Sequence, residues 1–458
     1  MIANVQKKNE EIKKLVQSLE EKLEEVSSLE SYHDIYRVPR ELYKLKPDAY
    51  TPQSVSIGPV HHNKEHLKAM ETQKLRYLKR FLNRSGKTLD FYVKAVSDLE
   101  EEARKCYSDI KSFGRDEFVK MIMMDSCFIF ELMEIMKSME EENNFISNEA
   151  WTIEITTDLI KLENQLPLFV LKHLHGLLFD DHPRQGEQPS PLPPPPLPLH
   201  HHIYVHLIKP YAVVFNGPIL SSAEEIESLL LAEGGAKHFL DFLRCILIPS
   251  SSSSKGMRKH GGGGGGGVDQ EENLRLTYNA SELKTAGVKF QNSPAKKTSL
   301  FDIEFDMRKG VLRIPTITIW DDTEPLLRNL IAIEQYQPYT SRYFTAYAAF
   351  MDDLIDTAGD VELLVRKGII ANRVGSVETV VNLFNNITKH VIVGCPYFSG
   401  VIKELGDYHD KSWNKWMANL RQNYFHTPWA VISVVAAVFL IILTVIQTIC
   451  SILQVKQF

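Results

Sequence analysis

The chain has 458 residues, of which 44% are hydrophobic, so it can bury one large core or two ordinary ones. There are 52 Lys and Arg residues against 58 Asp and Glu, and the net charge of -6 offers no positive field to hold nucleic acid, which is excluded as an expected partner. The five cysteines are scattered without a C-x-x-C pair, which argues against a disulfide framework or a zinc knuckle.

Residues 1–30 lack the continuous apolar run of a secretory signal. Apolar residues recur there every three or four positions between Glu and Lys, which predicts an amphipathic, charged helix. A short coiled coil is the alternative, but the apolar stripe covers fewer than four heptads and Lys22 interrupts it. The stripe consists of Ile12, Leu15, Leu19, Leu23 and Val26.

Residues 31–425 are predicted to form a single α-rich domain. Residues 116–139 are apolar almost all round, which is typical of a helix buried on every face. Residues 155–178 are similar, but Pro167 should kink this helix or divide it in two. A Ser cap, an acidic first turn and a Gly stop predict a further helix within residues 221–235.

Two low-complexity stretches are predicted to be disordered surface inserts in that domain. Residues 182–202 are proline-rich and favour polyproline II, as a stiff spacer or as a docking strip for an aromatic groove, and the spacer is the preferred interpretation. Residues 250–267 are a Ser and Gly tract with too little apolar surface to fold.

After the second insert the hydrophobic period changes to two. Residues 301–320 predict a small β hairpin or meander that turns near Lys309 and Gly310. Helical spacing then returns, with Thr323 and Ser376 as caps. The predicted fold class is therefore mainly α, with a minor β hairpin or meander and one C-terminal transmembrane helix.

The transmembrane prediction rests on residues 429–453, which contain no charged side chain. As a helix this segment is about 37 Å long, enough to cross a hydrocarbon layer of about 30 Å. Three basic residues precede it and only Lys456 follows, so the positive-inside rule places the large domain in the cytosol. We expect a single-pass anchor, with the plasma membrane as its location. The preceding basic residues are Lys411, Lys415 and Arg421.

An extracellular domain is the alternative orientation. Three N-x-S/T sequons, at Asn83, Asn279 and Asn386, would be glycosylated only on the lumenal side. Three short matches in a chain of this length are weak evidence, so the cytosolic orientation is preferred.

No catalytic motif is present in the sequence. The glycine heptamer within residues 250–267 lacks the Gly-Lys-Ser/Thr ending of a phosphate loop, and G-x-S-x-G, H-E-x-x-H and kinase signatures are missing. Histidines cluster at His61 and His62 and again between His200 and His206, but without a fixed ligand spacing the structural or adventitious interpretation is preferred. No catalytic, cofactor-binding or metal-binding residue is assigned, and no cofactor is expected.

The most informative residues are polar side chains embedded in apolar sequence. Because an unpaired buried charge costs several kcal/mol, we expect them to meet in a structural polar network. In particular, Arg328 should lie within salt-bridge reach of at least one carboxylate before the inserts. Catalytic use of these carboxylates is the alternative. The predicted network comprises Asp125, Asp158, Glu163, Asn164, Arg328, Asn329 and Glu334.

Six blocks in order resemble the plant domain-of-unknown-function 247 family, from about Val38 to Ile452. The blocks are "VSIGPVHH", "METQKLRYLKRFL", "MMDSCFIFELM", "TTDLIKLENQLPLFVL", "FDIEFDMRKGVLRIPTITIWDDTEPLLRNLIAIEQ" and "YFHTPWAVISVVAAVFLIILTVIQTI". The resemblance implies a plant protein with one α-rich domain and a C-terminal membrane segment. Ser126 stands where the family commonly has Gly, a small replacement that should not disturb packing.

The resemblance also implies a function class. Some members of the family are associated with grass self-incompatibility, as candidate determinants recognised by partner proteins. We therefore expect a membrane-anchored recognition or signalling protein that acts through unidentified protein partners, without catalysis. The alternative is a membrane-bound enzyme that uses the carboxylates of Asp125, Asp158 and Glu163.

Overall fold

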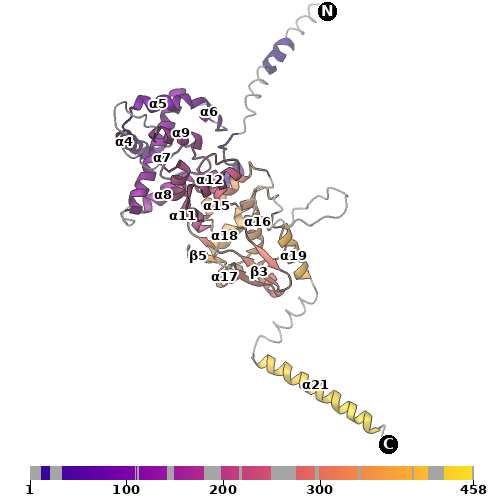
Figure 1. Cartoon of the computed structure of the whole chain (residues 1–458). Helices are drawn as coiled ribbons and strands as arrows, with labels where there is room; N and C mark the ends of the chain where they lie inside the picture. Colours follow the sequence, from indigo (N-terminus) through magenta and orange to yellow (C-terminus); the bar gives the residue numbers. More distant parts are fainter. Residues whose placement is uncertain are drawn as a thin grey trace, which may run out of the picture. The chain divides into compact units, whose positions relative to one another are not determined.

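The computed structural model is mainly helical, with few strands, which confirms the predicted mainly α class (Figure 1). Its described residues divide into two compact units, instead of the single domain predicted for residues 31–425. Unit 1 takes Met1–Pro210, Leu220–Ile246 and Arg328–Tyr336, and unit 2 takes the other ranges. The structure describes residues 12–20, 33–108, 110, 113–141, 149–179, 197–215, 219–248, 275–293, 299–338, 342–394, 397–410 and 428–455.

Unit 1 is built around the long helix α7 (Arg115–Glu141), against which α4 (Lys68–Ser85) and α5 (Leu89–Asp98) pack (Figure 1). Residues 121–133 of α7 are all buried, which confirms burial on every face for the central part of the helix predicted at 116–139, while Asp116, Glu117, Lys120, Lys137 and Ser138 are exposed. The other helical elements of this unit are α2 (Arg40–Leu45), α3 (Pro47–Tyr50), η1 (Glu65–Leu67), α6 (Glu100–Lys105), α8 (Glu149–Leu159), α9 (Leu168–Phe179), α10 (Leu199–Ile203), η2 (Tyr204–Ile208), α12 (Ala223–Ala232) and α13 (Phe239–Leu247), whose last residue belongs to unit 2.

Proline divides the second predicted helix rather than kinking it. The helix α8 ends at Leu159 and α9 begins at Leu168, directly after Pro167. The eight residues between them, 160–167, are all buried, so this loop lies in the core of unit 1. A buried loop needs partners for its backbone N–H and C=O groups, and this requirement shapes the site described below.

One part of the first predicted insert is ordered and helical. The prediction of disorder for residues 182–202 is wrong at its end, because α10 begins at Leu199 and includes His200, His201 and His202. Leu199 and Ile203 are buried, so apolar packing stabilises this turn. Residues 182–196 of this insert and the whole of 250–267 lie outside the described residues. Of the predicted N-terminal helix, residues 12–20 are described and are helical.

Unit 2 contains the strands of the described chain in two small sheets. β2 (Glu304–Asp306) pairs antiparallel with β3 (Val311–Ile314), which confirms the predicted hairpin. β1 (Lys289–Asn292) adds to β3 in parallel, and β4 (Ile317–Ile319) pairs in parallel with β5 (Ile370–Asn372), neither of which was predicted. The helices of unit 2 are α14 (Ala280–Thr285), α16 (Tyr343–Leu354), α17 (Ala358–Arg366), α18 (Val377–Ile387), α19 (Ser399–Asp410) and α21 (Pro428–Val455), while α11 (Lys209–Val214) and α15 (Thr323–Glu334) have residues in both units.

A buried carboxylate stabilises the first turn of α17. Asp360 accepts hydrogen bonds from the backbone N–H and hydroxyl of Thr357 and from the backbone N–H and hydroxyl of Ser281. Burial acts to raise the pKa of Asp360, but these hydrogen bonds outweigh it and hold the pKa below its ordinary value.

We expect Asp360→Asn to lower the free energy of unfolding of unit 2 by about 2 kcal/mol, since hydrogen bonds to a charged group are lost or weakened. Because the folded-state pKa is lowered, this contribution is present above the unfolded pKa of about 3.9 and is lost as the pH falls through the folded-state value. Urea unfolding at pH 7 and pH 3 measures both effects. Glu362→Gln, at an exposed position of the same helix, is the control and should change stability by less than about 0.5 kcal/mol.

The C-terminal segment is a helix, α21, of 28 residues. Within the described part of the chain, no helix combines the length and the apolar character that crossing a bilayer requires.

Candidate functional site

Three of the predicted polar residues, Asp125, Asp158 and Asn164, bind one largely buried stretch of chain, which we call the core segment (residues 53–58, sequence QSVSIG). It lies between α3 and η1 and forms neither helix nor strand. Val55, Ser56 and Ile57 are fully buried. Because the segment forms neither helix nor strand, its buried backbone N–H and C=O groups need hydrogen-bond partners outside regular secondary structure.

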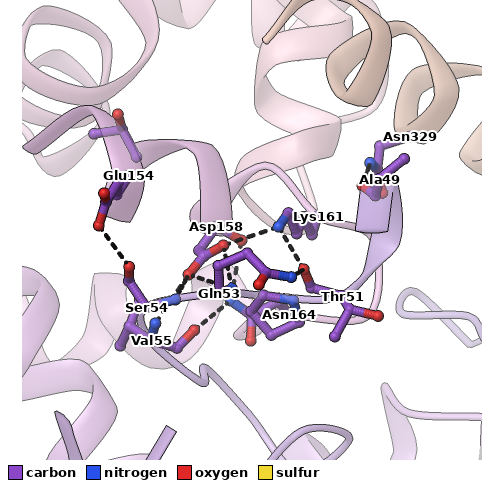
Figure 2. Close-up of polar contacts among 12 residues, drawn as sticks. Ala49, Thr51, Gln53, Ser54, Val55, Glu154, Asp158, Lys161, Asn164 and Asn329 are labelled. Carbon is purple, nitrogen blue, oxygen red and sulfur yellow. Dashed lines mark hydrogen bonds and ion pairs between the residues drawn. The ribbon is translucent and has the colours of Figure 1, made fainter. Parts of the chain in front are cut away.

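Asp158, near the end of α8, is the partner of three of these N–H groups. Its carboxylate accepts hydrogen bonds from the backbone N–H groups of Gln53 (3.0 Å), Ser54 (2.6 Å) and Val55 (2.9 Å), as Figure 2 shows. The ammonium of Lys161 balances the charge, because it donates to Asp158 Oδ1 (3.0 Å) as well as to the carbonyl of Thr51. A carboxylate bound in this way orders the chain around it.

Asn164 pairs with Val55 and Ile57 of the core segment. Its Oδ1 accepts the N–H of Ile57 at 2.6 Å, and its Nδ2 donates to the carbonyl of Val55 at 3.1 Å (Figure 2). One side-chain amide thus makes the two hydrogen bonds that a neighbouring strand would make.

Asp125 and Lys74 hold the end of the core segment. Asp125, from the buried part of α7, accepts the N–H of Gly58 at 2.8 Å. Lys74, fully buried on α4, donates to Asp125 Oδ1 (2.6 Å) and to the carbonyl of Ser56 (2.5 Å) and also contacts Glu71. Burial raises the pKa of Asp125 even though the adjacent Lys74 acts to lower it.

Gly58 is required by both its conformation and its surroundings. Its φ of +75° lies in the left-handed region, and an added Cβ would lie 2.4 Å from the carbonyl oxygen of Gln165. That carbonyl also accepts a hydrogen bond from the hydroxyl of Tyr107 at 3.0 Å, so it is fixed in place. The core segment and the loop after α8 therefore approach each other more closely than any side chain would permit.

Glu163, in the same loop, anchors a different part of the chain. Its carboxylate accepts the N–H of Val38 at 2.8 Å and contacts His61 (3.4 Å) and Arg37 (3.6 Å). Burial acts to raise the pKa of Glu163, but the hydrogen bonds from His61 and Val38 and the charge of Arg37 lower it below its ordinary value. Burial also lowers the pKa of His61.

Asn329 reaches the same loop from α15. It accepts the N–H of Leu162 at 2.9 Å and donates to the carbonyl of Ala49 at 2.8 Å (Figure 2). It therefore joins stretches of unit 1 that are far apart in the sequence.

The structure places five of the predicted residues in polar contacts within unit 1, and the hydrogen bonds described above join them to backbone groups; these residues are Asp125, Asp158, Glu163, Asn164 and Asn329. Lys74 pairs with Asp125, Lys161 with Asp158, and Arg37 and His61 with Glu163. Arg328 and Glu334 are buried in unit 1, and the expected ion pair of Arg328 with one of these carboxylates stays a prediction.

These cations have no distinctive signal in the sequence. Lys74 lies in a stretch rich in Lys and Arg that is typical of an exposed helix face, and Lys161 lies in a loop.

The site is best described as a backbone clamp: the side chains of Lys74, Asp125, Asp158, Lys161 and Asn164 acting on the core segment. In the part of the chain that the structure describes, no group of three or more His, Cys, Asp or Glu side chains is arranged to hold a metal ion.

The three sequon asparagines lie in helices or at a helix end. Asn83 lies in α4, and Asn279 caps α14 by accepting the N–H of Glu282. Asn386 lies in α18 and donates to the carbonyl of Asn382.

Comparison with known proteins places this architecture in a family. The model of the DUF247 family, described as plant protein of unknown function, matches residues 35–443. The chain belongs to the DUF247 family. The resemblance noted in its sequence blocks is thereby confirmed, and the core segment and the backbone clamp lie inside the matched range.

Two relatives of DUF247 type are UPF0481 proteins of Arabidopsis thaliana. At3g47200 is 31% identical over 436 residues, covering 92% of this chain and 86% of the relative. At3g02645 is 24% identical over 508 residues, covering 94% of this chain and 92% of the relative. No solved structure matches the chain.

Proposed function

We propose that this plant protein is a recognition or signalling protein tethered to a membrane by α21, which acts through protein partners and performs no catalytic step. The proposal rests on α21, a helix of 28 residues that carries a run of exposed apolar side chains. Apolar side chains that are exposed along a helix favour contact with lipid or with the core of another protein.

The side chains of α21 support this role. Between Ile432 and Thr448, every residue whose burial is described is exposed, and large apolar groups occur around the whole circumference. Thr444 and Thr448 donate their hydroxyls to carbonyls of the preceding turn, so these polar groups need no water. The exposed apolar residues are Ile432, Phe439, Leu440, Ile441, Ile442, Leu443, Val445 and Ile446.

The backbone clamp favours a non-catalytic protein over the alternative enzyme. Asp125, Asp158 and Glu163, the carboxylates that an enzyme would use, each accept at least one backbone N–H and contact a basic side chain. Their geometry is explained by the need to satisfy buried backbone, without a substrate. Self-incompatibility, the role associated with some family members, is one recognition process that suits such a protein.

Binding to lipid vesicles tests the anchor. The full chain, mixed with vesicles of phosphatidylcholine and phosphatidylserine and spun through a density gradient, should float with the lipid. The double variant Ile441→Arg/Val445→Arg should lose most of this flotation, because each Arg near the bilayer centre costs about 2.5–3.5 kcal/mol.

The control double variant, Ile219→Arg/Leu231→Arg, changes two exposed apolar residues outside α21 and should float as the parent does. A full chain that stays at the bottom of the gradient would contradict the anchor, and so would equal flotation of the α21 variant.

We further propose that the folded units face the cytosol of the plant cell, at the plasma membrane. Protein expressed in plant cells should then keep its electrophoretic mobility after treatment with an endoglycosidase, because Asn83, Asn279 and Asn386 would never meet the glycosylation machinery. A mobility shift would reject the cytosolic orientation and support an extracellular one.

A further inference from the structure

Three histidines from consecutive helical elements lie together in unit 1. His175 comes from α9, His202 from α10 and His206 from η2, and we call them the histidine cluster. The ring centroids of His175 and His202 are 5.9 Å apart, and those of His202 and His206 are 6.1 Å apart with the rings stacked. Phe130 of the buried helix α7 lies beside His175, at 6.3 Å between ring centroids.

This cluster is placed where positive charge is poorly tolerated. His206 is buried and the other two rings are half-buried. Burial, with the neighbouring His202, lowers the pKa of His175 to about 4, and burial with the positive groups nearby lowers the pKa of His206 to about 4. Burial lowers the pKa of His202 as well, and the neighbouring His201 lowers it further.

The charged groups around the cluster do not compensate for this burial. Lys137 of α7 and Lys209 of α11 add positive charge, while Glu134 of α7 adds negative charge toward His202 but also contacts Arg84 of α4 at 3.8 Å. On α10, His201 adds to the repulsion, and Glu224 of α12 acts on His200 and His201 rather than on the cluster.

The backbone at the cluster is itself of a rare kind. η2 is a single π-helical turn, and such turns occur mainly where tertiary packing imposes them, frequently at functional sites. Its neighbours provide that packing: Leu207 and Ile208 are buried, η2 contacts α7, and the hydroxyl of Tyr204 accepts the N–H of Leu220 at 2.9 Å. The turn therefore depends on contacts that a charge among the histidines would oppose.

We propose that the histidine cluster is an acid-sensitive latch, which keeps α10 and η2 packed on α7 and α9 while the rings are neutral and releases them when the rings gain protons. This places a pH-controlled change at the C-terminal end of the proline-rich stretch 182–202.

The direction of the effect follows from proton linkage. In the released state the histidines have the ordinary pKa of about 6.5, so between that value and about 4 the released state binds more protons than the packed state. The packed state is therefore fully favoured above about pH 6.5 and is lost progressively as the pH falls toward 4. Because two of the rings are half-buried, we expect a rise in the opening equilibrium on the order of tenfold between pH 7 and pH 5.

Hydrogen exchange followed by mass spectrometry tests the latch on the full chain in detergent micelles. After correction for the intrinsic rate, peptides covering residues 199–208 should lose about tenfold protection at pH 5 relative to pH 7. The double variant His202→Asn/His206→Asn cannot be charged there and should show less than about threefold change. His173→Asn, at an exposed position of α9, is the matched control and should retain the parent response.

Equal protection of residues 199–208 at the two pH values in the parent chain would overturn the proposal. So would an unchanged pH response in the double variant. If that variant fails to fold, an NMR titration of the parent chain with selectively labelled histidine rings replaces it. Three rings that titrate well below pH 6 support the latch, and titration of all rings near pH 6.5 rejects it.

Discussion

Replacing Gly58 by alanine is expected to lower the free energy of unfolding of unit 1 by about 4 kcal/mol, an effect in the uncommon upper range for a single substitution. Two costs add. The residue has a φ of +75°, where a Cβ is strained, and the added carbon would lie 2.4 Å from a backbone carbonyl oxygen that cannot rotate away. Relief by a shift of the core segment would break the bond from Gly58 N–H to Asp125. Urea unfolding monitored by far-UV circular dichroism measures the loss.

Gly86, which ends α4, provides the matched control. It has a similar φ of +66°, but nothing lies within 4 Å of an added Cβ. Gly86→Ala should therefore cost only the conformational strain, about 1 kcal/mol. If the two alanine variants were equally stable, the close approach between the core segment and Gln165 would carry no energetic weight, contrary to our description of the site.

Lys74→Met is expected to cost about 4 kcal/mol, because it leaves the carboxylate of Asp125 buried without its cation and the carbonyl of Ser56 without its donor. Methionine has nearly the same length as lysine, so loss of packing contributes little. Lys68→Met, on the exposed part of the same helix, removes only a surface pair with Glu65 and should change stability by less than about 0.5 kcal/mol.

The pH dependence of the Lys74 variant separates an electrostatic cost from a packing cost. Burial already raises the pKa of Asp125, and removal of Lys74 raises it further, because Lys74 acts to lower it. A raised folded-state pKa means that stability is present below the unfolded pKa and is lost as the pH rises through the folded-state value. The deficit of Lys74→Met relative to the parent chain should therefore shrink between pH 7 and pH 5. A deficit that is the same at both pH values would show that Lys74 acts by packing alone.

Local signals in the sequence predicted the elements well. The division at Pro167, the caps at Ser222 and Ser376 and the hairpin around Gly310 all depend on residues within a few positions of one another. The start of α10 was missed because its apolar residues stand beside a proline and histidine run that conceals their spacing. The division into two units was not predicted either, because the pattern of an apolar segment does not indicate in which of two cores it packs.

The site was predicted in its acidic members and missed in its basic ones. A carboxylate or amide in apolar sequence, such as Asp125 or Asn164, is conspicuous. Its partners cannot be recognised in the sequence, because they are backbone groups of the core segment, which have no sequence signature. They also lie far away along the chain: Gly58 is 67 positions from Asp125, and Ile57 is 107 positions from Asn164. Lys74 has the sequence context of an ordinary surface residue, and only the packing of α4 against α7 buries it.

The position of Asn329 has a consequence for synthesis on the ribosome. This residue binds Ala49, 280 positions earlier, and Leu162, 167 positions earlier. The parts of unit 2 that precede Arg328 are therefore translated before unit 1 receives its last segment, Arg328–Tyr336. A nascent chain halted near residue 300 would hold an incomplete first unit, open at Ala49 and Leu162. Neither unit can be obtained by cutting the gene once, and chaperones that shield unfinished cores would have longer to act on this protein than on one whose domains follow each other in order.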